Sequence, residues 1–383
     1  MEKRLRALAG KFPVAAVTGP RQSGKTTLVR KTFPKYAYVS LENMDIRNFA
    51  VRDPRGFFST YPAPVILDEI QRAPSLLSYM QTLVDETGKC GQYVLTGSNN
   101  LMLLESISQS LAGRVALLHL LPFSFGELSS GGKAPDTVEK MMFLGGYPRL
   151  YDKNLTPEEF YGNYVATYVE RDIRQIIRVT DLDRFQRFLK MCAARSGQII
   201  NLSSLGNDCG INHGTAKAWL SILQACYIAH LLSPHHENFG KRLMKNPKLY
   251  FYDTGLLCHL LGIGKAADLA YHPNRGHIFE TWVISELLKS RFNAGLRSNL
   301  YFWRDHVGHE IDCLMENGRT LTAVEIKSGL TLADDHFEGL DYFRKLAGKK
   351  CPACRLIYAG SESQTRRDSH VVDWRTFGRT PST

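Results

Sequence analysis

The sequence lacks any apolar run long enough to cross a membrane, and the residues after Met1 do not form the apolar core of a secretory signal peptide. We therefore expect no integral membrane association and a cytoplasmic location. Cysteine is also scarce, because the 383 residues include 8 that are scattered along the chain. Such usage favours reduced thiols over a framework of structural disulfides.

One pair of cysteines, Cys351 and Cys354, has the spacing of zinc ligands. No second pair of cysteine or histidine residues stands at a suitable distance to complete a set of four ligands. We therefore do not expect a structural zinc site.

Acidic residues are fewer than basic ones, with 37 Asp and Glu against 48 Lys and Arg and a formal net charge of +11. This excess favours an anionic partner, either a nucleic acid or a membrane surface, and does not decide between them. The rest of the composition, 44% hydrophobic and 22% charged, is that of an ordinary globular protein. A chain of this length can bury a sizeable core and is expected to form two or three domains.

What the sequence does contain is a complete phosphate-binding loop. The stretch GPRQSGKT at 19–26 fits the template G-x-x-x-x-G-K-[ST] at every fixed position. Its glycines let backbone N–H groups turn toward phosphates, Lys25 reaches the β- and γ-phosphates, and the Thr26 hydroxyl is placed for Mg²⁺. An apolar strand at 14–17 and a helix from 27 onward are expected on either side. The predicted nucleotide contacts are Gly19, Pro20, Arg21, Gln22, Ser23, Gly24, Lys25, Thr26 and Thr27.

A second apolar stretch, at 64–67, ends in the carboxylates of Asp68 and Glu69. A phosphate loop needs a carboxylate at the tip of a neighbouring strand to hold Mg²⁺ and its water, and Asp68 meets that need. Glu69 could polarise the attacking water. An acidic pair at a strand end is often only a solvated turn, but its place downstream of a complete phosphate loop favours catalysis. Asp68, Glu69 and Lys25 are therefore predicted catalytic residues.

Two further strands are expected to add polar groups. The strand at 92–96 is followed by Ser98 and Asn99, one of which could sense the γ-phosphate because parallel strands end at the same edge of a sheet. Arg114 precedes an apolar strand at 115–121 and could neutralise transition-state charge in its own subunit or in a neighbour. An ordinary surface charge is the alternative for this arginine.

The sequence resembles a prokaryotic branch of the AAA+ ATPases. The resemblance is carried by TGPRQSGKTTL, VILDEIQ, VLTGSN, LAGRV and PFSFGEL, and it continues through GGYP at 145–148 and YVERDI at 168–173. It covers nearly the whole chain and implies an ATPase followed by a C-terminal domain of unknown function. The sequence has no Asn-Lys-x-Asp motif for reading guanine, so ATP with Mg²⁺ is expected rather than GTP.

The region after the ATPase core is expected to be helical from 131 to 195, with Thr156 at the start of one helix. The resemblance implies that these helices form the small lid of AAA+ proteins. Arg171, Asp172 and Arg174 could face a neighbouring subunit, as in a homo-oligomer, or form a solvated surface.

Residues 196–270 predict a winged helix, with two helices around a glycine turn and strands at 227–232 and 248–252. The loop between these strands carries basic residues that suit phosphates: Lys241, Arg242, Lys245 and Lys248. Winged helices also serve as protein-binding modules, and the second helix exposes little beyond His213 and Lys217. Nucleic acid, DNA in preference to RNA, is the expected partner on charge and fold rather than on base-reading residues.

The final segment, 271–383, carries a second possible site. Alternation along the strand at 322–327 puts Glu325 and Lys327 on one face, and Asp312 lies on the adjacent strand. These residues resemble the core of the PD-(D/E)xK nucleases, with Glu280 as an additional acid. Glu280, Asp312 and Glu325 would then hold a divalent metal while Lys327 orients the water. A nucleic-acid-binding or structural relic and an accidental match of a short motif are the alternatives.

The sequence thus predicts an α/β protein in four parts. These are an AAA+ ATP-binding core with a parallel sheet at 1–130, a helical lid at 131–195, a winged helix at 196–270 and a smaller α/β nuclease-like domain at 271–383. The expected function is ATP hydrolysis that drives conformational work on a partner. The alternatives are a nucleotide-dependent switch with slow turnover and an ATP-gated metal-dependent nuclease.

Overall fold

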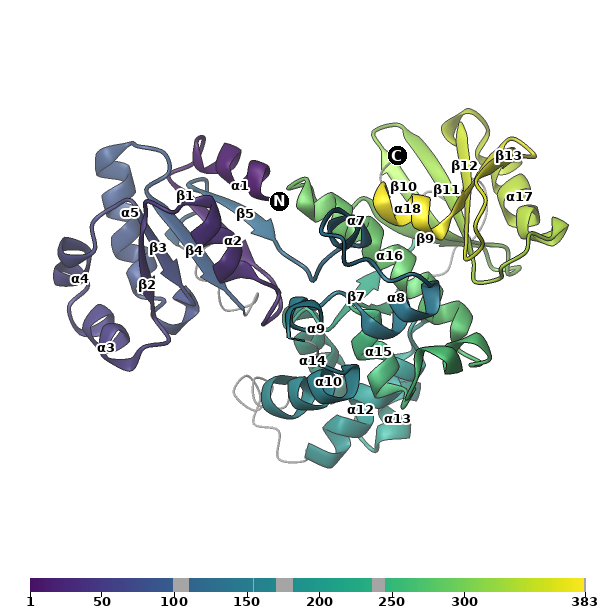
Figure 1. Ribbon diagram of the computed structural model, residues 1–383, viewed down its shortest axis with the longest axis horizontal. Helices are drawn as coiled ribbons and strands as arrows, with labels where there is room; N and C mark the ends of the chain where they lie inside the picture. The colour runs from purple at the N-terminus through teal and green to yellow at the C-terminus, as the bar shows by residue number, and fades with distance from the viewer. Residues whose placement is uncertain (99–109, 154, 170–181, 236–244, 382–383) are drawn as a thin grey trace. The chain divides into compact units, whose positions relative to one another are not determined.

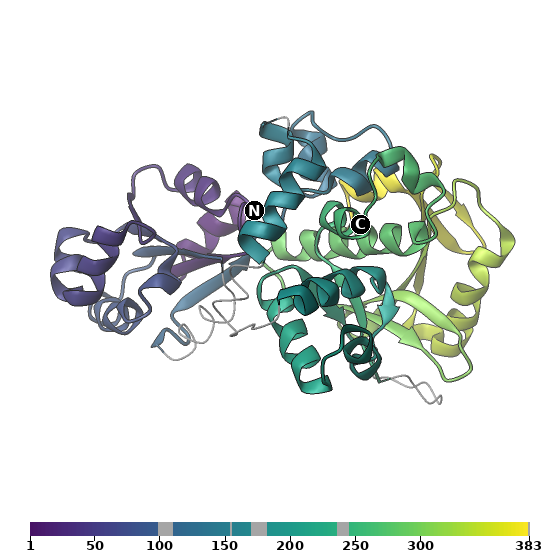
Figure 2. The same cartoon turned by 90° about the horizontal axis from the view of Figure 1, so that it is seen from below.

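The computed structural model describes residues 1–98, 110–153, 155–169, 182–235 and 245–381 (Figures 1 and 2). Its contacts divide the chain into two compact units. The first comprises Met1–Pro122, Ala225–Tyr227 and Arg291–Arg297, and the second comprises Phe123–Gln224, Ile228–Ser290 and Ser298–Thr383. The expected lid, winged helix and nuclease-like region thus share one unit, and their separation into domains stays a prediction. Among the described residues, no helix is both long and apolar enough to span a bilayer.

The first unit is built on a five-stranded sheet in the order β2-β3-β4-β1-β5, in which neighbouring strands are parallel. The strands are β1 (Val14–Thr18), β2 (Ala37–Ser40), β3 (Val65–Asp68), β4 (Tyr93–Gly97) and β5 (Val115–His119). Strands β1, β3, β4 and β5 agree with the strands predicted from the sequence to within two residues at either end. The parallel sheet of the predicted α/β fold is therefore confirmed.

Helices cover both faces of this sheet (Figure 1). They are α1 (Glu2–Ala9), α2 (Lys25–Thr32), α3 (Met44–Arg52), α4 (Pro54–Thr60) and α5 (Leu76–Thr87). Successive residues of β1 point to opposite faces, so Ala15 and Val17 pack against α1 and α2, whereas Val14 and Ala16 pack on the side of α4 and α5. A strand buried on both faces must be apolar at every position, which explains its continuous apolar run.

The second unit begins with short helices. They are α7 (Phe125–Ser130), α8 (Val138–Leu144), α9 (Pro148–Asp152), α10 (Pro157–Tyr164), the π-helix η2 (Val165–Val169) and α12 (Leu182–Ala194). Thr156 caps α10 as predicted, because its hydroxyl accepts from the Glu159 N–H at 3.2 Å while the Glu159 carboxylate accepts from the Thr156 N–H at 2.8 Å. Arg171, Asp172 and Arg174 lie outside the described residues.

The helices and strands predicted for a winged helix are present. They are β6 (Gln198–Ile199), α13 (Leu202–Cys209), α14 (His213–Ala225), β7 (Ala229–Leu232) and β8 (Lys248–Phe251). Gly210 ends α13 with φ of 65°, which is the glycine turn expected between the two helices. The strands form an antiparallel sheet in the order β6-β8-β7, so β8 is paired along both of its edges.

The remaining elements form a six-stranded mixed sheet in the order β13-β14-β12-β11-β10-β9. Its strands are β9 (Leu300–Arg304), β10 (Glu310–Asn317), β11 (Thr320–Lys327), β12 (Ala353–Tyr358), β13 (Gln364–Arg366) and β14 (Ser369–Asp373), and the helices of this region are α15 (Thr254–Leu260), α16 (Arg275–Asn293), α17 (Glu338–Ala347) and α18 (Trp374–Arg379). Helix α17 packs on the sheet through Leu340 and Phe343. Short 3₁₀ helices occur at Ile70–Arg72, Ala266–Ala270, Asp334–Phe337 and Gly348–Lys350.

Candidate nucleotide-binding site

The loop between β1 and α2 has the backbone that its glycines predict. Gly19 has φ of 154°, and a Cβ at this position would lie 2.0 Å from the carbonyl oxygen of Leu120. Gly24 precedes α2 with φ of 94°. Residues with side chains rarely adopt such positive φ values, so glycine is required at both positions.

Lys25 is buried within this loop. Its ammonium donates to the carbonyl oxygens of Gly19 at 3.0 Å and Pro20 at 2.7 Å. Burial lowers the pKa of Lys25 to about 8, although the nearby carboxylates of Glu69 and Asp68 oppose this shift. The ammonium therefore lies among the loop's own acceptors, where phosphate oxygens could replace the two carbonyls.

Asp68, at the end of β3, accepts hydrogen bonds from three hydroxyl groups. Thr26 donates to its two carboxylate oxygens at 3.0 and 3.2 Å, and Tyr38 donates to Oδ2 at 2.8 Å. The third donor is Thr96, which contacts Oδ1. Thr26, which follows the loop lysine, thus meets the carboxylate of Asp68 as the sequence predicts. Together the two side chains could hold a Mg²⁺ ion.

Glu69, the next residue, leaves the strand with φ of 58°, a left-handed conformation that is uncommon outside glycine. Its carboxylate Oε2 accepts from the Ser98 hydroxyl at 2.9 Å and contacts the Gln71 amide nitrogen. The Gln71 amide also donates to Ser98 at 3.3 Å. The carboxylate is therefore held in place by two polar side chains beside Asp68.

Two other predicted loop residues, Ser23 and Thr27, differ in their burial. The Ser23 hydroxyl donates to the Pro20 carbonyl at 2.9 Å inside the loop, and Thr27 is exposed on α2. Asn99, the second predicted γ-phosphate sensor, lies outside the described residues.

Three contributors to this site were not predicted from the sequence: Tyr38, Gln71 and Thr96. Thr96 could have been noticed as a hydroxyl residue at the tip of an otherwise apolar strand. Tyr38 gives no such signal, because its contact with Asp68 depends on the pairing of β2 with β3.

Arg114 requires a correction. It precedes β5, and β5 is parallel to β1, so Arg114 lies at the edge of the sheet opposite the phosphate loop. There it forms an ion pair with Asp85, with Nη2 at 2.8 Å from Oδ2. The prediction that Arg114 acts on the nucleotide of its own chain is therefore wrong, and action on a neighbouring subunit stays a prediction.

The expected basic wing also differs from the structure. Lys241 and Arg242 lie outside the described residues, and Lys245 is exposed. Lys248 is buried and its ammonium lies 2.9 Å from the Glu280 carboxylate. A lysine buried against carboxylates cannot contact a phosphate backbone, so its assignment to the wing surface is wrong.

The structure brings together the four residues of the nuclease-like pattern. The Lys327 ammonium lies 2.7 Å from Glu325 Oε1, and Asp312 accepts from the Ile326 N–H at 2.8 Å. Glu280, on α16, accepts from the Tyr250 hydroxyl at 2.6 Å. Within the described part of the chain, however, no three His, Cys, Asp or Glu residues are arranged to hold a metal ion. Two of the three predicted metal ligands, Glu280 and Asp312, converge on the Lys248 ammonium, and Glu325 pairs with Lys327.

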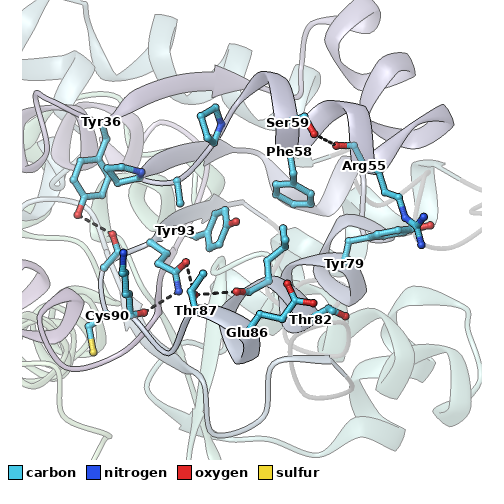
Figure 3. Close-up of a pocket in the computed structure, with 17 residues that line it drawn as sticks. Tyr36, Arg55, Phe58, Ser59, Tyr79, Thr82, Glu86, Thr87, Cys90 and Tyr93 are labelled. Carbon is cyan, nitrogen blue, oxygen red and sulfur yellow. Dashed lines mark hydrogen bonds between the residues drawn. The ribbon is translucent and has the colours of Figure 1, made fainter.

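A pocket of about 990 Å³ lies in the first unit, away from the phosphate loop (Figure 3). Its lining includes Tyr36, Pro64 and Tyr93, which stand at the amino ends of three parallel strands, whereas the phosphate loop follows the carboxyl end of β1. Phe58 and Tyr93 both line it, with ring centroids 5.7 Å apart in an edge-to-face arrangement (Figure 3). The pocket shares no residue with the predicted nucleotide contacts.

Comparison with protein families identifies three successive regions. An AAA domain family matches residues 11–129, a domain of unknown function (DUF8612) matches 135–267, and a second one (DUF4143) matches 275–377. An uncharacterized protein of Mycobacterium tuberculosis is 31% identical over 330 residues, which cover 85% of this chain and 72% of the relative. An uncharacterized protein of Haemophilus influenzae is 24% identical over 398 positions, covering 94% of each chain.

Among solved structures, the Walker-type ATPase of Pyrococcus abyssi is similar with a TM-score of 0.46 and 15% identity, over 68% of this chain and 94% of that one. DnaA from Aquifex aeolicus bound to AMPPCP gives a TM-score of 0.31 and 13% identity, over 58% of this chain and 85% of that one. The complete phosphate loop, the adjoining Asp68 and the family matches agree. The chain belongs to the AAA family of P-loop ATPases, in a group of proteins that carry an additional C-terminal domain of unknown function.

Proposed function

We propose that this chain binds ATP with Mg²⁺ at residues 19–27 and hydrolyses it. The observation that carries the proposal is the meeting of Thr26 with Asp68, while Glu69 stands next to Asp68 and is held by Ser98. A phosphate loop alone supports nucleotide binding. A neighbouring pair of carboxylates, one for a metal and one for a water molecule, supports turnover.

The roles follow from the contacts. Lys25 would exchange its two loop carbonyls for phosphate oxygens, and Thr26 and Asp68 would hold Mg²⁺. When bound there, the ion would supply positive charge to neutralise the charge that develops on the phosphate oxygens. Glu69 would accept a proton from the attacking water, while Ser98 and Gln71 fix the direction of its carboxylate.

Two substitutions test the assignment. Lys25→Ala removes a phosphate contact and should weaken ATP binding at least tenfold, which corresponds to about 1.4 kcal/mol. Glu69→Gln should keep ATP binding and reduce the hydrolysis rate by roughly a hundredfold or more, because only water activation is lost. Binding is measured with a fluorescent ATP analogue and turnover by phosphate release. Equal hydrolysis by Glu69→Gln and the wild type would sink the catalytic assignment.

We further propose that hydrolysis drives conformational work on a nucleic acid, with DNA preferred to RNA. The net charge of +11 supports an anionic partner, and the paired helices α13 and α14 expose His213 and Lys217. Lys248 is buried and cannot attract such a partner, so the attraction must come from the exposed Lys245 and its neighbours in sequence. Co-purification of nucleic acid with the Glu69→Gln protein would identify the partner.

A nucleotide-dependent switch in a homo-oligomer is the second candidate. It is favoured by the loop lysine, which is held by carbonyls of its own loop and would have to exchange these contacts when nucleotide enters. Steady-state hydrolysis with and without DNA or RNA separates the candidates. Strong stimulation supports a motor, and slow turnover that is indifferent to nucleic acid supports a switch.

A further inference from the structure

Four carboxylates from three elements lie together in the second unit, and three of them form ion pairs with one buried lysine. Glu280 comes from α16, Glu310 and Asp312 from β10, and Glu325 from β11. Cys313 pairs with Val324 across β10 and β11, so the next residues, Asp312 and Glu325, lie side by side. Lys248, the first residue of β8, reaches into this group.

The Lys248 ammonium is coordinated by acidic oxygens. It lies 2.9 Å from Glu280 Oε1 and 3.9 Å from Asp312 Oδ1, and it forms an ion pair with Glu310 Oε1. The ring of Phe302 lies 5.7 Å from the nitrogen, at a distance that adds a cation–π contact. Three carboxylates and an aromatic ring therefore lie around the ammonium.

The charges favour the ammonium form. Burial alone would lower the pKa of Lys248, but the neighbouring carboxylates, Glu280 foremost, raise it above its usual value. Burial and the nearby Glu325 carboxylate raise the pKa of Asp312 well above the usual range, which favours its neutral form. Glu310 also pairs with Arg304 at 3.1 Å, and Glu325 pairs with Lys327. Three cations, those of Lys248, Arg304 and Lys327, thus pair with the three carboxylates other than Asp312.

Lys248 cannot easily leave this position. Its side chain is 4% exposed, and its strand is paired with β6 on one edge and β7 on the other. A metal ion held by the same oxygens would come close to a fixed ammonium, and the two cations would repel each other. A divalent ion needs several oxygens at about 2.0–2.6 Å from it. Here the carboxylate oxygens that could serve already contact the ammonium.

We propose that Lys248 is the built-in cation of this acid cluster and takes the place of a divalent metal, so that the cluster joins β8 to α16 and β10 instead of supporting metal-dependent cleavage. The sequence pattern predicts the opposite, a divalent metal held by Glu280, Asp312 and Glu325. The proposal does not depend on the ATPase assignment, because none of these residues contributes to the phosphate loop.

The test uses the full-length chain in a Lys25→Ala background without nucleotide, with Mn²⁺ as the probe. With Lys248 present, millimolar Mn²⁺ should leave the melting temperature unchanged. Lys248→Met removes the ammonium at similar volume and leaves the acids unbalanced, so the melting temperature should fall. Mn²⁺ should then restore several degrees through binding to the folded state. Adding Asp312→Asn to Lys248→Met should abolish this Mn²⁺ effect.

Lys327→Met is the matched control, because Lys327 contacts the same cluster but its side chain is 32% exposed. This variant should show no Mn²⁺ stabilisation while Lys248 remains. Should Lys248→Met fail to fold, Mn²⁺ binding to the Lys25→Ala protein decides the matter alone. Equal Mn²⁺ binding with and without Asp312→Asn supports the proposal, and one Mn²⁺ per chain that is lost in Asp312→Asn overturns it. A folded Lys248→Met protein that gains no Mn²⁺ stabilisation also overturns it.

Discussion

At the scale of single residues, the nucleotide site depends on hydroxyl groups as much as on the charged residues of its motifs. Asp68 accepts from Thr26, Tyr38 and Thr96, so its orientation is set before any ion binds. Removing such a partner of a metal-binding carboxylate commonly lowers the metal affinity by about 10- to 100-fold. The contact from Tyr38 is the one that the sequence motifs do not include.

Tyr38→Phe should therefore raise the Mg²⁺ concentration needed for tight nucleotide binding by about 3- to 10-fold, because the Tyr38 ring is partly exposed and the effect is screened. Binding of the nucleotide without Mg²⁺ should change little. The measurement is a titration of fluorescent ATP analogue at several Mg²⁺ concentrations.

Tyr36→Phe is the matched control for this prediction. Its hydroxyl donates to the Gly91 carbonyl at 2.8 Å, at the opposite edge of the sheet. The control should lower stability by about 1 kcal/mol and leave the Mg²⁺ requirement unchanged. Identical Mg²⁺ dependence of the two variants would contradict a positioning role for Tyr38.

His230 gives a second prediction at this scale. It packs between the rings of Tyr250 and Tyr252, with centroids 5.5 and 4.8 Å away, and neither of its ring nitrogens has a hydrogen-bond partner in the described structure. Burial lowers its pKa to about 3. Below a pH of about 6.5 the unfolded chain takes up a proton at this histidine and the folded chain does not. Stability should therefore fall by about 1.4 kcal/mol per pH unit as the pH decreases from 6.5 toward 3.

The check is the urea midpoint of the wild type and of His230→Phe at pH 7 and pH 5.5. The variant should lose less stability on acidification, by the contribution of one proton. The same loss in both proteins would show that His230 does not remain neutral in the folded state.

At the scale of secondary-structure elements, helix α16 carries a buried ion pair that holds the segment before α7. Glu286 is fully buried, accepts from the Phe125 N–H at 2.9 Å, and lies 2.9 Å from the Lys289 ammonium. Lys289 in turn donates to the Phe123 carbonyl at 3.0 Å. The pair therefore satisfies the N–H of the first residue of α7 and a carbonyl just before this helix, two groups that have no partner within the helix.

Glu286→Ala should destabilise the protein by about 3–5 kcal/mol, because it leaves the Lys289 charge and the Phe125 N–H buried without their acceptor. Glu286→Leu combined with Lys289→Met should be less damaging than Glu286→Ala, since no unpaired charge remains. Glu2→Ala is the control, because the Glu2–Arg6 pair of α1 is exposed and should be worth less than about 1 kcal/mol. Denaturant unfolding measures all three, and equal losses for Glu286→Ala and Glu2→Ala would contradict the assignment.

The elements themselves were largely predictable, but the contacts of their ends were not. The core strands of the first sheet appear in the sequence as continuous apolar runs because both faces are covered, and the glycines of the phosphate loop fix its turn. The sequence assigns Lys248 to the surface of the wing because this lysine follows a basic stretch. The sequence alone does not show that β8 buries its first residue. The acids that surround Lys248 come from α16 and β10, far along the chain, so only the fold brings them together.

At the scale of the whole molecule, the positive charge decides which partner to test. Lys217 and Lys245 are exposed in the region expected to form a winged helix, and Lys241 and Arg242 lie outside the described residues. If the wing contacts phosphates, removing three of its charges should weaken binding to all nucleic-acid sequences alike. The slope of log affinity against log salt concentration should then fall by about 2 to 3, because each contact contributes about 0.9 on duplex DNA.

The wing variant combines Lys241→Ala, Arg242→Ala and Lys245→Ala. Its control removes the same net charge from exposed lysines of the first unit, through Lys3→Ala, Lys11→Ala and Lys35→Ala. A general electrostatic attraction would change both salt slopes equally, whereas a defined wing contact changes only the first. If neither slope changes, the wing does not contact phosphates, and a protein partner becomes the better explanation because winged helices also bind proteins. Stimulation of ATP hydrolysis by DNA should weaken in parallel with binding in the wing variant, since a motor responds to the partner that it holds.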